Sequence, residues 1–397
     1  MRSSARTIEK GHRGVSITLF LCLFAGQGAL IVMSPVLVEA AGNLGVSTAT
    51  AGQLRTVTGL AAAVTALLLG SAAARVGLGR QLLVASVLLV AGSLASAVAP
   101  TFTVLLLAQV PVGVAVGVLT TAGMLASAEW VAPELRAQAL SWALIGQPAA
   151  WIVGMPLIGI VGGISWRLGW LVLPLASAIA AGLLVAPRAT QPAHRTRRTP
   201  IRAVLEDRTL AAWLAAELAA NAAWTGTLVY AGALFVESYR VSTGLTGCLL
   251  AIAAAVYVAG NLTARRLVHV EARGVLVTLS LLLAFSDSAF GAMRGGVATS
   301  TLLFSVAAFL AGGRTLLTSA FALSRSPELR PTVASLRIAA LQLGYFAGSI
   351  AGGAALALGG FGAFGAVMGL LFLASALALA QRVGSARRSP VFTGADG

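Results

Sequence analysis

Apolar stretches of about 20 residues recur along almost the whole chain and are separated by short polar segments. A helix of that length crosses a bilayer core of about 30 Å. The pattern predicts twelve such helices, over residues 15–38, 50–74, 80–99, 102–128, 137–163, 168–186, 209–236, 244–264, 274–293, 297–323, 332–358 and 361–381. The first lacks the cleavage site of a secretory signal, so we expect it to be retained. We therefore predict an all-α integral membrane protein.

Composition supports this class. Apolar residues make up 58% of the chain and charged residues 10%, compared with about 25% charged residues in soluble proteins. The mean hydropathy is +0.91. A soluble fold of this size could not bury so much apolar surface, so the sequence excludes a soluble protein.

The positive charge, +15 at pH 7, follows the predicted topology. Placing both termini in the cytoplasm assigns most of the basic residues, Arg337 among them, to cytoplasmic segments, as the positive-inside rule requires. Four arginines then lie outside, and Arg314 alone lies within the membrane. The outer four are Arg55, Arg167, Arg240 and Arg294. The charge therefore needs no nucleic-acid partner, and we predict a bacterial cytoplasmic membrane protein in contact with lipid.

A polar stretch with three prolines and six arginines divides the chain into two halves that repeat. Pro-Glu-Leu-Arg occurs at 133–136 and again at 327–330. Parallel six-helix repeats joined by a linker are one architecture of secondary transporters. The predicted units are a tail over 1–14, a bundle over 15–186, a linker over 187–208, a bundle over 209–384 and a tail over 385–397.

Two motifs carry a resemblance to a known family. The stretch 70–80 is similar to a glycine- and arginine-rich loop pattern at four positions, namely Gly70, Arg75, Gly77 and Arg80. Gly154, Pro156 and Gly159, followed by Trp166–Arg167, are similar to a helix-5 motif of efflux transporters. Over essentially its whole length, the chain resembles the major facilitator superfamily, in its twelve-helix drug/proton antiporter and sugar-efflux branch.

The resemblance implies gating roles for these motif residues, and it implies that Glu129 latches to Arg75 or Arg80. The chain departs from the branch at Ala74, where an acidic residue is usual, and at Gln109, where arginine is usual. The family's charge relay and proton coupling therefore do not transfer directly to this chain.

Enzymatic chemistry finds no support in the sequence. Lys10, the one lysine, precedes its only nearby glycines, which excludes a P-loop. Cys22 and Cys248 lie in separate apolar runs, and no histidine, cysteine or carboxylate cluster has the spacing of metal ligands. We predict no metal, no cofactor and no catalytic residues.

Ionisable residues in apolar surroundings are costly and therefore indicate function. Glu217 and Arg314 lie at matching depths in the segments 209–236 and 297–323, each about 12–14 Å from the cytoplasmic face of the membrane. By the resemblance, both segments line a central cavity, so we predict that the two residues meet there. The alternative is a purely structural salt bridge.

Trp213, Glu217, Asn221 and Trp224 are spaced by four, four and three residues, so they share one helical face. A face that mixes tryptophan with polar groups suits a large, partly apolar substrate. Gln27 and Gln109 are further substrate-binding candidates, although a lone glutamine within a membrane more often joins two helices.

We predict Glu217 as the proton carrier, displaced from Arg314 by substrate, with Asp287 as the alternative carrier unless it pairs with Arg294. Glu39 and Arg55 flank the first external loop and are predicted to form a rim pair.

The function predicted is export of a drug-like compound or metabolite by proton antiport, by a monomer working through alternating access. A sugar or amino-acid exporter, or a sensor or scaffold that does not transport, are the alternatives.

Overall fold

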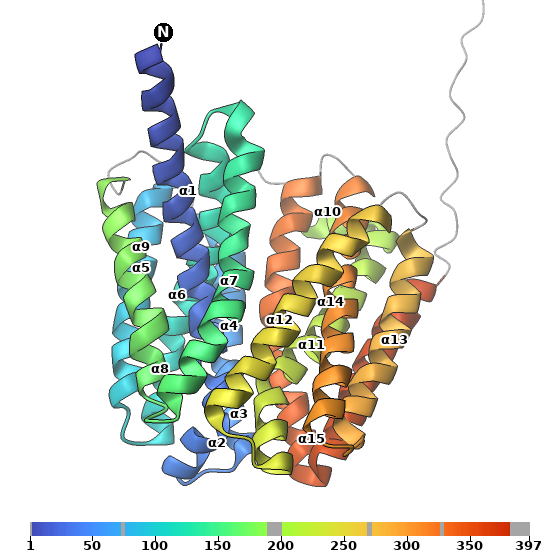
Figure 1. The fold of residues 1–397 in the computed structure, drawn as a ribbon. Coiled ribbons are helices and arrows are strands. Elements are labelled where there is room, and N and C mark those ends of the chain that lie inside the picture. The colour runs from blue at the N-terminus through green and yellow to red at the C-terminus, as the bar shows by residue number, and fades with distance from the viewer. Residues whose placement is uncertain (1, 73–75, 189–200, 268–271, 326–328, 382–397) are drawn as a thin grey trace, which may run out of the picture.

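A computed structural model describes residues 2–72, 76–188, 201–267, 272–325 and 329–381 of the chain (Figure 1). All regular secondary structure within these ranges is helical. The predicted all-α membrane fold is confirmed. Most helix boundaries lie close to the predicted ones, but the first predicted helix, 15–38, is divided between α1 and α2, and α1 already begins at Arg2, within the predicted tail.

In the described part of the N-terminal half, nine α-helices and three short 3-10 or π turns follow one another. They are α1 (Arg2–Ile31), α2 (Met33–Asn43), α3 (Thr48–Gly52), α4 (Leu54–Ala72), α5 (Leu78–Val98), α6 (Phe102–Glu129), η2 (Pro133–Leu135), α7 (Arg136–Gly162), α8 (Leu168–Trp170), η3 (Leu171–Leu175), α9 (Ala176–Val185) and η4 (Ala186–Arg188). Side-chain caps begin two of them: Ser47 accepts from Thr50 N at α3 and Thr101 accepts from Val104 N at α6, each satisfying a free backbone donor.

The C-terminal half contains α10 (Ile201–Glu206), α11 (Arg208–Tyr239), α12 (Thr243–Ala264), η5 (Arg265–Leu267), α13 (Ala272–Ala292), α14 (Val297–Arg325) and α15 (Arg330–Ala380). Asp207 caps α11 by accepting from the backbone N–H groups of Thr209 and Leu210. Arg240 ends α11 in the left-handed region, at φ 56°.

The 51-residue helix α15 is two membrane-crossing helices joined by a sharp turn. Gly359 and Gly360 have non-helical backbone angles, and Gly360 has φ 64° and ψ −161°. A residue with a side chain adopts that conformation only at a cost, which explains glycine at this position. Among the described residues, eleven helices are long and apolar enough to cross a membrane, and the break in α15 divides one of them into the two predicted segments.

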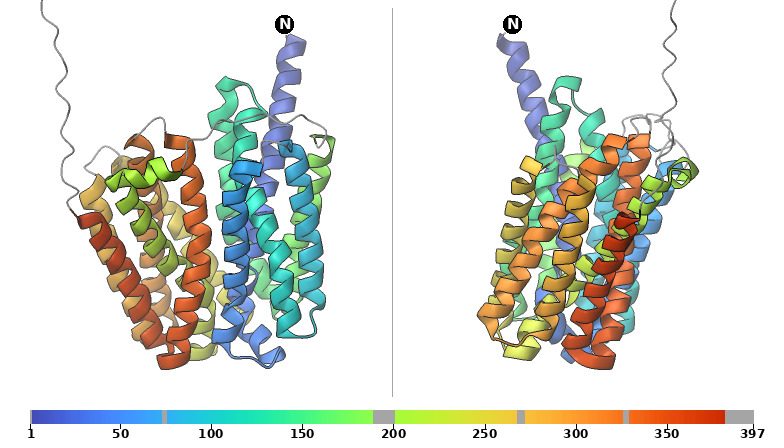
Figure 2. Two further views of the ribbon diagram at one scale, coloured as in Figure 1. Left: turned by 180° about the vertical axis from the view of Figure 1, so that it is seen from behind. Right: turned by 90° about the vertical axis from the view of Figure 1, so that its right-hand side faces the viewer.

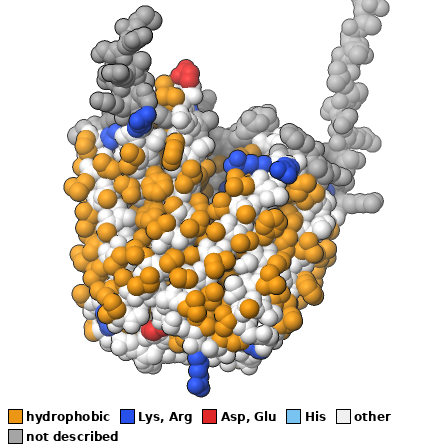
Figure 3. Space-filling model, viewed as in Figure 1, with side chains coloured by type: hydrophobic (Ala, Val, Ile, Leu, Met, Phe, Trp, Pro, Cys, Tyr) orange, Lys and Arg blue, Asp and Glu red, His pale blue; other side chains and the backbone are white. Residues whose placement is uncertain are grey.

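The two halves form separate bundles that lie side by side (Figures 1 and 2). The start of α1 and the end of α15 lie toward the same end of the molecule, as an even number of crossings requires. On the face seen in Figure 3, apolar side chains cover the middle of the molecule, and most Lys and Arg side chains lie toward its two ends.

Part of the predicted linker over 187–208 is structured. Helix α10 contacts the C-terminal bundle through Val204, which is fully buried in one apolar cluster with Leu210 and Trp213. Residues 189–200 of the linker lie outside the described part of the chain.

Candidate functional site

The two bundles meet along a seam at the end of the molecule where α2, α3 and the α11–α12 junction lie, opposite the start of α1 (Figure 1). Glycines bring backbone against backbone there. A Cβ on Gly232 would collide with the Ser34 carbonyl, and one on Gly247 would collide with the Met155 carbonyl. Substitution of either glycine would therefore force the two halves apart.

Hydrogen bonds cross the same seam. Gln53 Nε2 donates to the Ser349 carbonyl over 2.9 Å. The Tyr230 hydroxyl reaches the Ala49 carbonyl of the other half over 3.2 Å and the Ser349 carbonyl of its own half over 3.1 Å. The Thr48 hydroxyl donates to Glu237 at the outer rim. These contacts tie α3 and α4 to α11 and α15.

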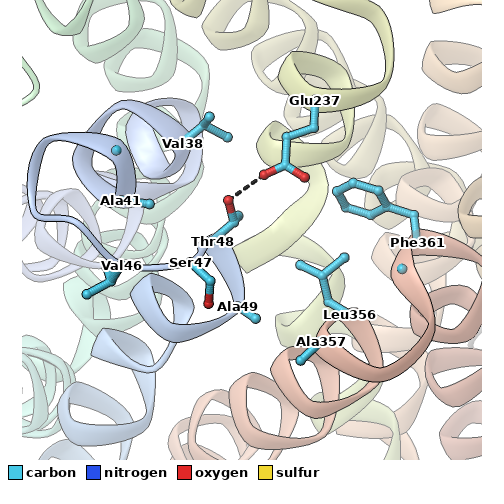
Figure 4. A pocket seen from close by; sticks show the side chains of 12 residues that line it. Val38, Ala41, Val46, Ser47, Thr48, Ala49, Glu237, Leu356, Ala357 and Phe361 are labelled. Atoms are coloured by element: carbon cyan, nitrogen blue, oxygen red, sulfur yellow. Dashed lines mark hydrogen bonds between the residues drawn. The ribbon is translucent and has the colours of Figure 1, made fainter.

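An open pocket of about 640 Å³ lies on the outer side of the seam (Figure 4). Thr48 and Glu237 meet across it, and Val38, Leu356 and Phe361 line its apolar walls. Its position outside the interbundle hydrogen bonds makes it a vestibule to the seam.

The predicted rim pair of Glu39 and Arg55 is wrong. Glu39 accepts a hydrogen bond from Thr243 of α12 instead. Arg55 turns inward, is 2% exposed and donates from Nη1 to the Ala29 carbonyl of α1 over 3.1 Å. Arg314 is therefore not the only arginine within the membrane. The spacing along the loop could not reveal which way α4 is rotated.

Arg55 lies at the seam with residues of both halves. Its guanidinium interacts electrostatically with Tyr345 of α15, and the Tyr345 hydroxyl lies beside Gln27 of α1. One turn further along α4, Gly59 lies directly against the backbone of α15. The structure thus places the predicted substrate-binding residue Gln27 where the two bundles meet.

Glu217 and Arg314 do form an ion pair, with 2.8 Å between Oε1 and Nη1. They are 3% and 5% exposed. The other guanidinium nitrogens are also satisfied, because Nε donates to Ser280 over 3.1 Å and Nη2 donates to Ser375 over 2.9 Å. Every nitrogen of this buried cation has a partner.

The position of the pair differs from the prediction. The hydrogen-bond partners of Arg314 come from α11, α13 and α15, so the pair lies inside the C-terminal bundle rather than between the two halves. Thr318 donates to the same Glu217 oxygen over 3.0 Å and accepts from Trp213 Nε1 over 2.9 Å. The network therefore continues along α11.

The predicted polar stripe divides between two environments. Trp213 and Glu217 are buried in the bundle, whereas Asn221 and Trp224 are half-buried. Asn221 lies against Gly344 of α15. Trp224 stacks on Tyr257 of α12, with 6.1 Å between ring centroids. Only the second half of the stripe thus has surface available to a ligand.

Gln109 lies within the N-terminal bundle and is fully buried. Its Oε1 accepts from Thr58 of α4, and its Nε2 donates to Ser96 of α5 and to the Leu105 carbonyl. This arrangement joins three helices, and we do not include Gln109 in the proposed site.

Asp287 is buried in α13 and accepts a 2.9 Å hydrogen bond from Thr227 of α11. The predicted pairing with Arg294 is wrong. Arg294 donates to the carbonyls of Phe290, Gly291 and Met293 at the end of α13, because these free carbonyls lie closer to it than the carboxylate one helix turn deeper.

The residues of the loop motif are only partly described. Gly70 lies near the end of α4 and Gly77 precedes α5 as its N-cap, whereas Arg75 lies outside the described residues. Glu129 and Arg80 have exposed side chains, and among the described contacts no ion pair joins them. The latch implied by the resemblance therefore stays a prediction.

The helix-5 motif lies on α7. Gly154 contacts Leu173 within the N-terminal bundle, and Pro156 is half-buried between the two glycines. A Cβ on Gly159 would lie 2.7 Å from the Thr243 carbonyl of α12. This places Gly159 on the seam between the two halves.

Sequence reasoning missed three seam residues, namely Gln53, Arg55 and Tyr345, and it missed the burial of Arg337 on α15. Arg337 is assigned to the cytoplasm by charge counting, yet it lies about two turns inside α15 and is half-buried. Gln53, Arg55 and Arg337 lie near the start of an apolar run, which could have signalled them, whereas Tyr345 lies in the middle of one. Only the rotation of the helices shows which of them face inward.

Known proteins share both a sequence profile and a fold with this chain. The Major Facilitator Superfamily profile matches residues 17–285. A solved D-xylose-proton symporter superposes with a TM-score of 0.73 at 16% identity, covering 93% of this chain and 97% of that chain. A bacterial homolog of the human lysosomal transporter Spinster, inward-facing and occupied, has a TM-score of 0.71 at 15% identity, with 92% and 94% covered. A mutant of the nucleoside transporter NupG has a TM-score of 0.71 at 15% identity, with 93% and 98% covered.

Proposed function

This chain belongs to the major facilitator superfamily and is a multi-pass membrane transporter rather than an enzyme; from that premise, we propose that it exports a small, partly apolar molecule by proton antiport. The cargo is a drug-like compound or a metabolite. Export proceeds by alternating access between the two bundles, across a cytoplasmic membrane with both termini on the cytoplasmic side.

The seam supports alternating access. The interbundle contacts of Gly232, Gly247 and Gln53 all lie toward one end of the molecule. Contacts between backbones and small residues separate without exposing a large apolar surface, and such residues allow close approach of helices in lipid. We infer that rocking of the bundles breaks this seam and forms a corresponding one at the other end.

The buried pair of Glu217 and Arg314 is the observation that carries the proposed coupling. A charged pair in the middle of a bundle is costly to bury and indicates function by default. Thr318, Ser280 and Ser375 provide a chain of hydroxyl groups around it. We infer that Glu217 takes up a proton when rearrangement of α11 and α14 weakens its contact with Arg314.

The test is export from proteoliposomes under an imposed pH gradient, screened over drug-like compounds, sugars and amino acids. For the compounds that wild-type protein moves, Glu217→Gln should abolish the response to the gradient but leave exchange between equal pools of substrate. Glu206→Gln is the matched control, because that carboxylate is exposed on α10 and pairs with Arg202.

Full proton-driven export by Glu217→Gln would remove Glu217 as the carrier. A wild-type protein that moves no compound with or without a gradient would favour the sensor or scaffold alternative. Movement restricted to sugars would replace the drug-like cargo and keep the transport mechanism.

A further inference from the structure

Arg55 is a buried cation that is only partly satisfied. Its Nη1 donates to the Ala29 carbonyl, and its Nη2 is buried with no hydrogen-bond partner among the described residues. Leaving a charged donor unpaired in a buried site is costly. The hydrogen bond to α1 therefore uses only one of the two terminal nitrogens of Arg55.

No acidic side chain of the described residues neutralises Arg55. Away from the helix ends, the described membrane-spanning segments contain two carboxylates, Glu217 and Asp287. Glu217 is bound to Arg314 and Asp287 to Thr227. Glu39, at the outer end of α2, is bound to Thr243. The missing counter-charge is therefore not supplied by this part of the chain.

A second cation lies on α15, the helix that carries Tyr345. Arg337 is on α15, eight residues before Tyr345, which corresponds to about 12 Å along the helix. Its Nε is buried and has no hydrogen-bond partner among the described residues. Arg337 interacts electrostatically with Tyr257, and Tyr257 interacts with Tyr345. Electrostatic interactions thus link Arg55, Tyr345, Tyr257 and Arg337 in a row, and Tyr257 also interacts with Glu217 and Arg314.

Aromatic surface and hydrogen-bonding groups adjoin this row. Trp224 is half-buried and stacks on Tyr257, and Gln27 is half-buried beside Tyr345. Gln342, one turn from Tyr345, has a buried Oε1 without a partner among the described residues. The row therefore combines guanidinium donors, aromatic faces and an unused amide acceptor.

We propose that the seam between the bundles binds an organic anion with an aromatic body, and that Arg55 Nη2 receives its carboxylate. The aromatic body lies against Tyr345, Tyr257 and Trp224, and Arg337 attracts the anion toward the seam from the side where α15 begins. This assignment rests on the proposed transport function and gives its cargo a charge.

The experiment is equilibrium dialysis of the purified full-length protein with 2-naphthoate and with 2-naphthamide, which differ in charge but hardly in shape. No pH gradient or transport is involved, so failure here is distinguishable from failure of the proposed transport function. Naphthoate should bind wild-type protein about 10- to 100-fold more tightly than naphthamide, the ratio expected for a charge-assisted hydrogen bond.

Three variants locate the effect. Arg55→Gln should remove the preference for naphthoate, and Arg55→Lys, which keeps the charge, should retain most of it. Arg167→Gln is the matched control, since Arg167 also donates to a backbone carbonyl but lies at the outer surface; it should behave as wild type. Elution volume and unfolding temperature establish that each variant is folded.

Equal binding of the two probes by wild-type protein would overturn the proposal, and so would an unchanged preference in Arg55→Gln. Binding of neither probe at millimolar concentration would overturn the aromatic anion as ligand. If Arg55→Gln does not fold, Arg337→Gln replaces it. If Arg337→Gln weakens the preference for naphthoate, the proposal is supported. If the preference is unchanged in Arg337→Gln, the proposal is overturned.

Discussion

Two buried arginines of this transporter occupy opposite situations. Arg314, inside the C-terminal bundle, has a partner for each of its three guanidinium nitrogens, including the carboxylate of Glu217. Arg55, at the seam between the bundles, has one backbone carbonyl and a terminal nitrogen without a partner among the described residues. Both are at most 5% exposed, so burial alone does not distinguish them.

The difference lies in what surrounds each charge. Arg314 is enclosed by helices of a single bundle, which would stay together under the proposed alternating access. Arg55 faces helices of the other half, so its environment would change in each proposed transport cycle. A fixed environment can satisfy a charge permanently, whereas a moving one leaves room for a ligand. We therefore propose stability and coupling as the roles of the ion pair, and cargo binding as the role of Arg55.

The largest effect is expected from breaking the ion pair. Glu217→Ala leaves Arg314 charged and buried without its counter-charge, and removal of one partner of a buried pair costs about 3–5 kcal/mol. The unfolding temperature in detergent should fall sharply. Replacing both residues, Glu217→Leu with Arg314→Met, should lower it much less, because no isolated charge remains. Equal losses in the single and double variants would contradict this account of Arg314.

Overpacking the seam should have the next largest effect. Gly232→Leu introduces a side chain where the Ser34 carbonyl lies. Overpacking costs about 1–3 kcal/mol, which corresponds to about a 5- to 150-fold shift between the two conformations. Spin labels at Ile164 and Met293, exposed residues of the two halves, should move apart in distance measurements. Gly274→Leu is the control, because nothing lies within 4 Å of a Cβ there.

Removing the seam cation should change stability little, in contrast to Arg314. Arg55→Met loses the hydrogen bond to Ala29 but also removes an unpaired buried charge, so we expect a net change within about 1 kcal/mol. The measurement is the unfolding temperature of Arg55→Met without ligand, compared with the unfolding temperature of Glu217→Ala. A loss as large as that of Glu217→Ala would mean that Arg55 is a structural residue like Arg314.

The smallest effect is expected at Asp287. Asp287→Asn keeps an oxygen that accepts the hydrogen bond from Thr227 and removes only the ability to carry a charge. Proton-driven export should keep more than half of its wild-type rate if Glu217 is the carrier. Loss of the gradient response in Asp287→Asn, with Glu217→Gln unaffected, would transfer the coupling role to Asp287.

Much of the fold could be predicted without coordinates. The length of each apolar run decides whether it crosses a bilayer, and in lipid every backbone group must be satisfied within the helix. The local sequence therefore determines where the helices form, and it also determines the break between the last two helices at Gly359 and Gly360. The depth of Glu217 and Arg314 followed from counting residues, which is why their contact could be predicted.

Only the tertiary structure decided which way each polar side chain faces. The bundle that encloses Arg314, the inward turn of Arg55 and the position of Gln109 among three helices depend on helix rotation and tilt. These are determined by contacts between residues far apart in the chain, such as Gly232 with Ser34. Hydrophobicity acts on each segment separately, whereas close packing acts between segments, so the first can be read along the chain and the second cannot.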